Sequence, residues 1–494
     1  MIKNLKWLLL VSLTVVACSS EDAVQVETNS SDGLPLTSGS ANFTKYVALG
    51  NSLTAGFSDN ALFIEGQKVS YTNIMAQQFK LVGGGEFKIP FMSDNIGGYK
   101  VGGTVISGAR LFFNGVGPAT VTGTPSTEIL TSVAAAGPYN NCGVPGAKSF
   151  HLLSPTYGSP GAGGANIFAG TANPYYIRFA PANGTTSVVA YAAAQAPTFF
   201  SLWIGNNDVL GYATTGGDGT NPITPSAGPA GVGFDATYDA LVNTMTSGTI
   251  PAKGVVANIP YVNTIPFFTT VPFNAAGVSA AQATALNSAY ATYNGGLVAA
   301  KNAGLILETE RLARTINFNA GANGLVMVDE YLTTVNVPAA GLVLPSLRQT
   351  TSADYVVLSA GGVSAQAFLP LGNGTQVALA DKWILSKNEV AELKTATDAY
   401  NAKIRAVATA KGLAFVDANA LLSQIAATGF SANGFTVSAT FITGGGFSTD
   451  GVHPSPRGYA VIANKFIEAI NSKYGSNLKG VDLGNYRILF PGTL

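Results

Sequence analysis

The sequence predicts an α/β protein built on a parallel sheet. Three apolar runs, 45–49, 198–204 and 254–259, have the length and composition of buried strands, and 413–416 adds a fourth. Segments with helical periodicity lie between them. Strands that alternate with helices favour a parallel sheet with helices on both faces, because right-handed crossovers return the chain to the same edge.

The predicted strands end at residues that interrupt regular structure. The run 45–49 breaks into Gly50, and the run 198–204 ends at Gly205. Pro260 ends the run 254–259, since proline cannot donate to a strand ladder. Each strand is therefore followed by a turn.

The predicted helices are located by their periodicity and their capping residues. Two capping boxes, Ser279 with Gln282 and Ser386 with Glu389, each begin a helix. The last helix is capped by Ser455, has proline in its first position and ends at Gly475. The predicted helices are 69–79, 238–245, the two that follow the capping boxes, and 456–474.

Two segments depart from this alternation. Residues 90–140 are rich in Gly, Thr and Pro without a steady period, so no element is predicted there. Residues 304–384 contain short apolar runs at 342–344, 355–358 and 377–379, separated by Gly- or Pro-containing turns. We expect an insertion or cap near the functional edge of the sheet, in which Arg348 and Asp354 serve structural pairing.

The composition excludes some classes of protein. The 26 Lys and Arg residues balance 26 Asp and Glu residues, and only 11% of the chain is charged, so no basic patch for nucleic acid is expected. Hydrophobic residues make up 47% of the chain, yet no internal run approaches the roughly 18 apolar residues of a spanning helix. A large core is therefore predicted.

The N-terminus resembles a bacterial lipoprotein signal. Lys3 and Lys6 precede the apolar run 7–17, and Val15-Val16-Ala17-Cys18 is similar to a lipobox. Residues 1–18 are then a signal peptide with its lipid-bearing cysteine, and 19–42 form a flexible polar tether. The protein is expected to be exported and anchored to the bacterial outer membrane by lipid, on the periplasmic or cell-surface side.

The chain has only two cysteines, Cys18 and Cys142. If Cys18 carries lipid, Cys142 has no partner and is expected to be a small buried thiol. No Cys/His cluster indicates a zinc site, and no glycine-rich loop before a helix indicates a phosphate site. No metal or cofactor is therefore expected.

Polar turns follow two of the predicted strands. Residues 50–56, Gly-Asn-Ser-Leu-Thr-Ala-Gly, place Ser52 in a tight turn that exposes its hydroxyl. Residues 205–208, Gly-Asn-Asn-Asp, follow the second buried strand. Open parallel sheets carry their sites at the carboxyl ends of strands, so both turns are expected at one edge. The Asn207 amide can donate a hydrogen bond to a developing oxyanion.

A carboxylate and an imidazole lie together near the C-terminus. Asp450 precedes His453 by three residues, and His453 is one of two histidines in the chain. The following proline favours an extended conformation for His453, which keeps it outside the next helix. A histidine beside a carboxylate is the base that a serine nucleophile requires. The alternative is a capped loop with a structural histidine.

Together these blocks resemble the SGNH hydrolases, also called the GDSL family of esterases and lipases. The matching blocks, in the family's order, are Gly50-Asn51-Ser52-Leu53, Asn141-Cys142-Gly143-Val144-Pro145-Gly146, Gly205-Asn206-Asn207-Asp208 and Asp450-Gly451-Val452-His453. The second block has a rival in Asn95-Ile96-Gly97-Gly98. The resemblance implies a flavodoxin-like three-layer α/β/α sandwich over residues 43–475, with the insertion 304–384 and a C-terminal extension 476–494.

The resemblance also implies a role for each matched residue. Ser52 would be the nucleophile, His453 the base, and Asp450 the residue that orients the base. The oxyanion hole would consist of the Ser52 and Gly146 backbone amides and the Asn207 side chain. The expected activity is hydrolysis of an ester of a small molecule, lipid or polysaccharide, without a cofactor.

One residue departs from the family pattern. Asn51 precedes the serine, where the family usually has aspartate. Asparagine keeps the size and one acceptor of that residue, loses its charge and gains a donor. The alternative function is therefore a non-catalytic, ligand-binding surface lipoprotein on the same scaffold.

Overall fold

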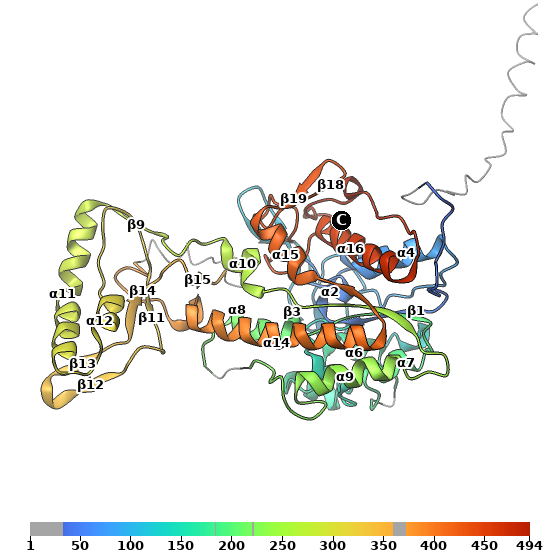
Figure 1. Cartoon of the computed structure of the whole chain (residues 1–494), viewed down its shortest axis with the longest axis horizontal. Coiled ribbons are helices and arrows are strands. Elements are labelled where there is room, and N and C mark those ends of the chain that lie inside the picture. The colour runs from blue at the N-terminus through green and yellow to red at the C-terminus, as the bar shows by residue number, and fades with distance from the viewer. Residues whose placement is uncertain (1–32, 183, 220–221, 359–371) are drawn as a thin grey trace, which may run out of the picture.

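A five-stranded parallel sheet forms the centre of the molecule (Figure 1). The computed structural model describes residues 33–182, 184–219, 222–358 and 372–494. Every pair of neighbouring strands in the central sheet is parallel. Its strands, in spatial order, are β6 (Asn141–Gly143), β1 (Tyr46–Gly50), β7 (Phe199–Trp203), β8 (Lys253–Ala257) and β17 (Ala414–Val416).

The central strands end level with one another. All residues of β1 and β7 are buried, which is typical of parallel strands covered on both faces. Gly50, the last residue of β1, pairs with Gly143 of β6 on one side and with Trp203 of β7 on the other. The segments that follow these three strands therefore leave the sheet at the same edge.

The strand order contains one reversal of direction. Numbered along the chain, the five strands lie in the order 2-1-3-4-5. The chain moves to one side from β1 to β6 and to the other side from β7 onward. In open parallel sheets such a reversal leaves a crevice outside the carboxyl ends of the two strands concerned. Here those strands are β1 and β7.

Helices cover the sheet on both sides (Figure 1). Helices α4 (Tyr71–Lys80) and α16 (Pro456–Tyr474) pack together on one side. Helices α7 (Val188–Ala193), α9 (Phe234–Met245) and α14 (Lys387–Lys411) lie on the other. The predicted α/β architecture with a parallel sheet is confirmed, as are the caps of α14 and α16.

Two predictions for the first half of the chain were incomplete. Strand β6 was not predicted, because its three residues resemble a turn. The unassigned segment 90–140 forms two small hairpins and a short turn of 3-10 helix. The hairpin strands are β2 (Tyr99–Val101), β3 (Thr104–Ser107), β4 (Leu111–Phe113) and β5 (Pro118–Thr120).

An inserted lobe, described over residues 271–358 and 372–385, projects from one end of the sheet domain (Figure 1). It begins earlier than the predicted boundary of 304, because β9 pairs with β10 and α11 packs against α12 and β13. The predicted strand 377–379 forms only isolated bridges. The elements of the lobe include β9 (Ala276–Val278), α11 (Ala280–Asn302), α12 (Glu308–Arg314), β10 (Gly321–Asn323), β11 (Val326–Val328), β12 (Val335–Val337), β13 (Leu342–Leu344), β14 (Leu347–Gln349), β15 (Tyr355–Val356) and β16 (Ile384–Leu385).

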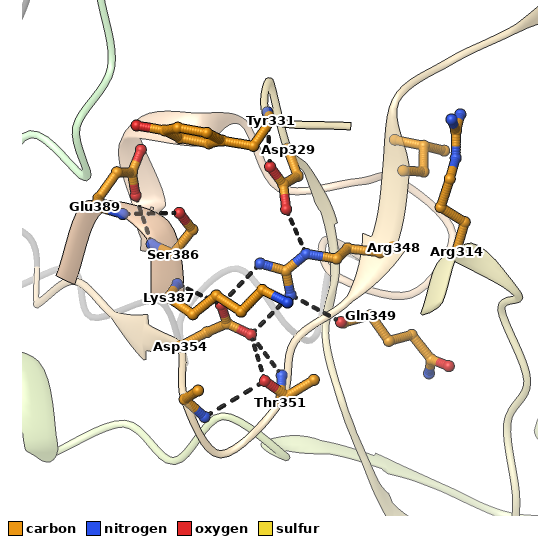
Figure 2. A network of polar contacts seen from close by, with 12 residues as sticks. Arg314, Asp329, Tyr331, Arg348, Gln349, Thr351, Asp354, Ser386, Lys387 and Glu389 are labelled. Carbon is orange, nitrogen blue, oxygen red and sulfur yellow. Dashed lines mark hydrogen bonds and ion pairs between the residues drawn. The ribbon is translucent and has the colours of Figure 1, made fainter. Parts of the chain in front are cut away.

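A buried ion-pair network holds the lobe to α14 (Figure 2). The Arg348 guanidinium lies 2.7 Å from Asp354 and 2.5 Å from Asp329. Asp354 also accepts a hydrogen bond from the backbone N–H of Lys387, in the first turn of α14. The predicted structural pairing of Arg348 with Asp354 is confirmed. One apolar core continues from the sheet into the lobe.

Both ends of the described chain pack on the sheet domain. The Ser40 N–H donates to the carbonyl of Tyr474 at 2.8 Å, so the predicted tether 19–42 is too long at its C-terminal end. The predicted extension 476–494 is not separate, since Arg110 donates to the carbonyl of Pro491 at 2.7 Å. Residues 1–18, with Cys18, lie outside the described residues. No helix in the described part of the chain has the length and hydrophobicity needed to cross a membrane.

The remaining short elements connect these parts. They include α2 (Ser52–Ala55), α3 (Ile64–Lys68), α5 (Ala165–Phe168), α6 (Pro174–Phe179), α8 (Asn206–Thr214), α10 (Pro266–Thr269), α15 (Ala418–Ala427), β18 (Phe430–Ala432) and β19 (Phe435–Val437). Of these, α2 and α8 begin directly after β1 and β7, at the edge where the strand order reverses.

Candidate active site

Ser52 is the first residue of α2, at the end of β1. Asn51 caps this helix, and its Oδ1 accepts a hydrogen bond from the Leu53 N–H at 3.1 Å. Gly50 is required for the turn, since a Cβ there would lie 2.1 Å from Thr54 Oγ1 and 2.5 Å from the Trp203 carbonyl. The helix has a single turn and ends at Gly56, whose φ is 85°. The predicted tight turn around Ser52 is confirmed, but it does not leave the residue on the surface: Ser52 is only 8% exposed and lines a small pocket.

Ser52, His453 and Asp450 form a continuous chain of hydrogen bonds. The Ser52 Oγ lies 3.0 Å from His453 Nε2, and His453 Nδ1 lies 2.9 Å from Asp450 Oδ2. A carboxylate only accepts hydrogen bonds, so His453 carries its proton on Nδ1 when neutral. Its Nε2 is then free to accept a proton from the serine hydroxyl.

Asp450 is held as a carboxylate. Its Oδ1 accepts from the backbone N–H groups of Val452 and His453, each at 2.8 Å. Burial raises the pKa of Asp450, but the charge of His453 and the hydrogen bonds from His453 and Val452 outweigh it and lower the pKa to about 2. Asp450 therefore stays ionised over the whole range in which His453 can act as a base.

The turn at Asp59 and Asn60 supports the carboxylate from the other side. Both residues have left-handed backbone, with φ of 51° and 62°, which Asp and Asn tolerate best after glycine. The Asn60 N–H donates to Asp450 Oδ2 at 2.8 Å. Asp59 accepts from the N–H and the hydroxyl of Thr449 at 3.0 and 2.6 Å. This turn was not predicted, although an Asp-Asn pair three residues after the end of the serine turn is a signal of left-handed backbone.

The block 205–208 connects three segments of the site. The Asn207 side chain donates to the Ala147 carbonyl at 2.9 Å, which leaves its second amide hydrogen uncommitted. Asp208 is buried and accepts from the N–H and hydroxyl of Ser149 at 2.8 and 2.6 Å. The Asn51 amide donates to Asn206 Oδ1 at 3.2 Å, which joins the serine turn to α8.

The three predicted oxyanion donors lie around one space. Asn207 lines a small pocket with Ser52 and His453, and it lines the adjoining cleft with Gly146 and His453. Among the described residues, neither the Ser52 N–H nor the Gly146 N–H has an acceptor. The rival pair Gly97 and Gly98 is buried against other segments and lines neither cavity. The structure therefore favours Gly146 over its rival.

Two cavities meet at Asn207 and His453, and Ser52 lines the inner one. The inner pocket, of about 60 Å³, has walls that are almost entirely apolar, with Trp203, Val262 and Ile265 among them. The outer cleft, of about 880 Å³, is lined by Leu210, Phe267, Phe441 and other residues. Leu358 and Trp383 of the lobe also line the cleft. The lobe therefore lies at the edge of the sheet where the insertion was expected.

The chain matches no protein-family model, no curated protein and no solved structure. The functional argument therefore rests on the geometry of these residues.

The second histidine lies apart from this chain of hydrogen bonds. The His151 ring stacks on Tyr157 with centroids 4.6 Å apart, and its Nδ1 accepts from the Lys148 N–H at 3.1 Å. Burial and the charge of Lys148 lower the pKa of His151 to about 4, so His151 is neutral near pH 7. Its contacts indicate a structural residue.

Cys142 is a free thiol on β6, next to β1. It is fully buried, and burial raises the pKa of its thiol. A buried protonated thiol is a poor nucleophile. The prediction of a small buried thiol is confirmed.

Proposed function

We propose that the protein is a serine-dependent carboxylic ester hydrolase of the SGNH or GDSL type. The observation that carries the proposal is the hydrogen-bonded chain of Ser52, His453 and Asp450 beside an apolar inner pocket and a larger cleft of mixed polarity. The strand order 2-1-3-4-5 supports a flavodoxin-like scaffold for it. The Ser52 turn and Asn207 follow the two strands at the reversal of that order, where such scaffolds hold ligands.

The first half of the reaction forms an acyl-enzyme. Ser52 Oγ attacks the ester carbonyl carbon while His453 Nε2 accepts the serine proton. The Asp450 carboxylate stabilises the imidazolium that results. The negative oxygen of the tetrahedral intermediate accepts hydrogen bonds from the Ser52 and Gly146 N–H groups and from the Asn207 amide. The intermediate then expels the alcohol, which takes the proton from His453.

The second half returns the enzyme to its starting state. Water attacks the acyl carbon and gives a proton to His453. The same three donors bind the second oxyanion. The carboxylic acid leaves when Ser52 recovers the proton from His453, so the overall reaction consumes one ester and one water molecule.

The cavities favour an ester with an extended apolar group. Burial of one CH₂ group is worth about 0.8 kcal/mol, or about fourfold in binding of a chain that fits the cleft. We expect cleavage of p-nitrophenyl esters with kcat/KM rising from the acetyl to the octanoyl ester. If none of these esters is cleaved and a fluorophosphonate does not label Ser52, the non-catalytic binding function takes its place.

Asn51 is compatible with this activity. Its Oδ1 accepts the Leu53 N–H as an aspartate would, and the Ser52 hydroxyl remains within hydrogen-bond distance of His453. In the wild type the Asn51 amide donates to Asn206 Oδ1. A carboxylate at position 51, as in Asn51→Asp, can only accept. The Asn206 amide would then rotate and donate its N–H to that carboxylate. Should the wild type prove inactive, this variant is the first to assay.

The Asn207 amide gives a further prediction. Asn207→Ala should lower kcat by about 10²–10³ and leave KM nearly unchanged, because the lost hydrogen bond strengthens in the transition state. Ser52 should still react with a fluorophosphonate. Asn243→Ala, on the surface of α9, provides the matched control. A folded Asn207→Ala enzyme with wild-type kcat would remove Asn207 from the oxyanion hole.

We also propose that Cys18 carries the lipid that anchors the protein to a membrane. The positively charged flank, apolar run and lipobox of the sequence motivate this proposal. Metabolic labelling with a fatty acid should tag the wild type and leave Cys18→Ala untagged. Equal labelling of the two proteins would contradict the anchor.

A further inference from the structure

Three carboxylates meet where the lobe joins the sheet domain. Glu330 lies in the turn after β11, Asp381 begins the short helix η7 (Asp381–Trp383), and Glu389 lies in the first turn of α14. One carboxylate oxygen from each lies within 4.8 Å of the other two. Oxygen ligands on opposite sides of a calcium ion, each at about 2.4 Å, are about 4.8 Å apart. The spacing therefore fits one cation among them.

Two of these carboxylates have buried oxygens without partners. Glu389 is 0% exposed, and its Oε1 has no hydrogen-bond partner in the described part of the chain. Its other oxygen, Oε2, accepts from the Ser386 N–H. The buried Oδ1 of Asp381 also lacks a partner among the described residues. Buried polar atoms are normally satisfied, so these oxygens indicate a ligand that the protein atoms do not supply.

The chain passes closely over the Glu389 side chain and the Asp381 backbone. After α8, Gly217 has a φ of 81°, and a Cβ there would lie 2.3 Å from Glu389 Oε1. A Cβ on Gly216 would lie 2.7 Å from the Asp381 carbonyl. The two glycines therefore let the backbone of the sheet domain close over the cluster and bring Asp218 near it.

No basic side chain neutralises the cluster. Among the described residues, Glu330, Asp381 and Glu389 form no ion pair with lysine, arginine or histidine. The nearby Arg348 is already bound to Asp329 and Asp354 (Figure 2). The cluster therefore brings up to three negative charges into a partly buried site.

We propose that Glu330, Asp381 and Glu389 bind a divalent calcium ion that joins the lobe to α14. Carboxylate oxygens are hard ligands, and calcium accepts the irregular geometry of an all-protein site more readily than magnesium. The ion would contact η7, the helix whose Trp383 lines the active-site cleft. It would thus stabilise the attachment of the lobe and one wall of the cleft.

The test is calcium binding by the full-length chain after treatment with EDTA. Titration calorimetry with CaCl₂ should give one site per chain. At a calcium concentration about 100-fold above its Kd, the Tm should rise by about 3 °C or more relative to EDTA. MgCl₂ should bind more weakly. Neither readout depends on ester hydrolysis, so the result is independent of the proposed activity.

Isosteric variants separate calcium binding from folding. Asp381→Asn and Glu389→Gln should each abolish the calorimetric signal and the calcium-dependent rise in Tm. In EDTA their Tm should equal or exceed that of the wild type, because a repelling charge is gone. Asp398→Asn is the matched control, since Asp398 lies on α14 and pairs with Lys394 outside the cluster. Absence of calcium binding by the wild type, or an unchanged calcium response in both variants, would overturn the proposal.

Discussion

Replacing Ser52 or His453 by alanine should reduce ester hydrolysis on the order of 10⁴-fold or more. The two side chains act as a unit, because the hydroxyl is a weak nucleophile until His453 Nε2, 3.0 Å away, accepts its proton. The double variant should therefore be little worse than either single variant. The measurement is kcat on the best p-nitrophenyl ester, with protein folding checked by circular dichroism.

Covalent labelling distinguishes the two roles within this unit. A fluorophosphonate should modify Ser52 in the wild type, react slowly with His453→Ala and leave Ser52→Ala unmodified. Ser472→Ala, an exposed serine on α16, is the matched control and should keep wild-type activity and labelling. Wild-type turnover by Ser52→Ala on every cleaved ester would refute the assignment of the nucleophile.

The residues of the proposed triad could be predicted because each has a distinctive local sequence. Ser52 follows a buried strand between glycines, and His453 is one of two histidines, three residues after Asp450. The structure brings these segments together although they lie 401 residues apart. The level ends of β1 and β7 place the turns that carry Ser52 and Asn207 at one edge of the sheet. His453 reaches Ser52 from the loop that precedes α16.

The supporting contacts could not be predicted, because they depend on backbone conformation. The contact of Asn60 with Asp450 needs a left-handed turn in one loop and a matching carboxylate 390 residues away. The lobe boundary was misplaced because α11 has ordinary helical periodicity, and only its packing against α12 assigns it to the lobe. Glu330, Asp381 and Glu389 show no motif, since they come from three separate segments.

Asp59 makes the stability of the folded state depend on pH. Burial raises its pKa from 3.8 to about 6, against the hydrogen bonds from Thr449 that lower it. The folded state therefore binds the proton more tightly than the unfolded state. The stability from this group is present below about pH 4 and is lost as the pH rises through 6. Asp450 has the opposite sign: its pKa of about 2 stabilises the fold above pH 4, and that stability is lost as the pH falls toward 2.

Asp450→Asn should lower kcat by about 10³–10⁴, less than the loss of Ser52 or His453. Every contact that reaches the carboxylate is a donor. Oδ1 accepts from the N–H groups of Val452 and His453, and Oδ2 accepts from the Asn60 N–H and from His453 Nδ1. Backbone donors cannot reverse, and two of them reach Oδ1 whereas one, the Asn60 N–H, reaches Oδ2. The asparagine oxygen should therefore stay at the Oδ1 position and keep two hydrogen bonds, and its NH₂ group should take the place of Oδ2 and lose the bond from Asn60.

That NH₂ group faces His453 Nδ1 and changes the tautomer of the ring. Nδ1 can form a hydrogen bond with this NH₂ group only by accepting one, so the imidazole proton moves to Nε2. A proton on Nε2 prevents that nitrogen from accepting the proton of Ser52. Because the chain has only two histidines, ¹⁵N labelling of histidine gives a direct readout, with His151 as internal reference. Nitrogen chemical shifts should report the Nδ1–H form of His453 in the wild type and the Nε2–H form in Asp450→Asn. An unchanged tautomer, or wild-type kcat in the variant, would show that Asp450 does not orient the base.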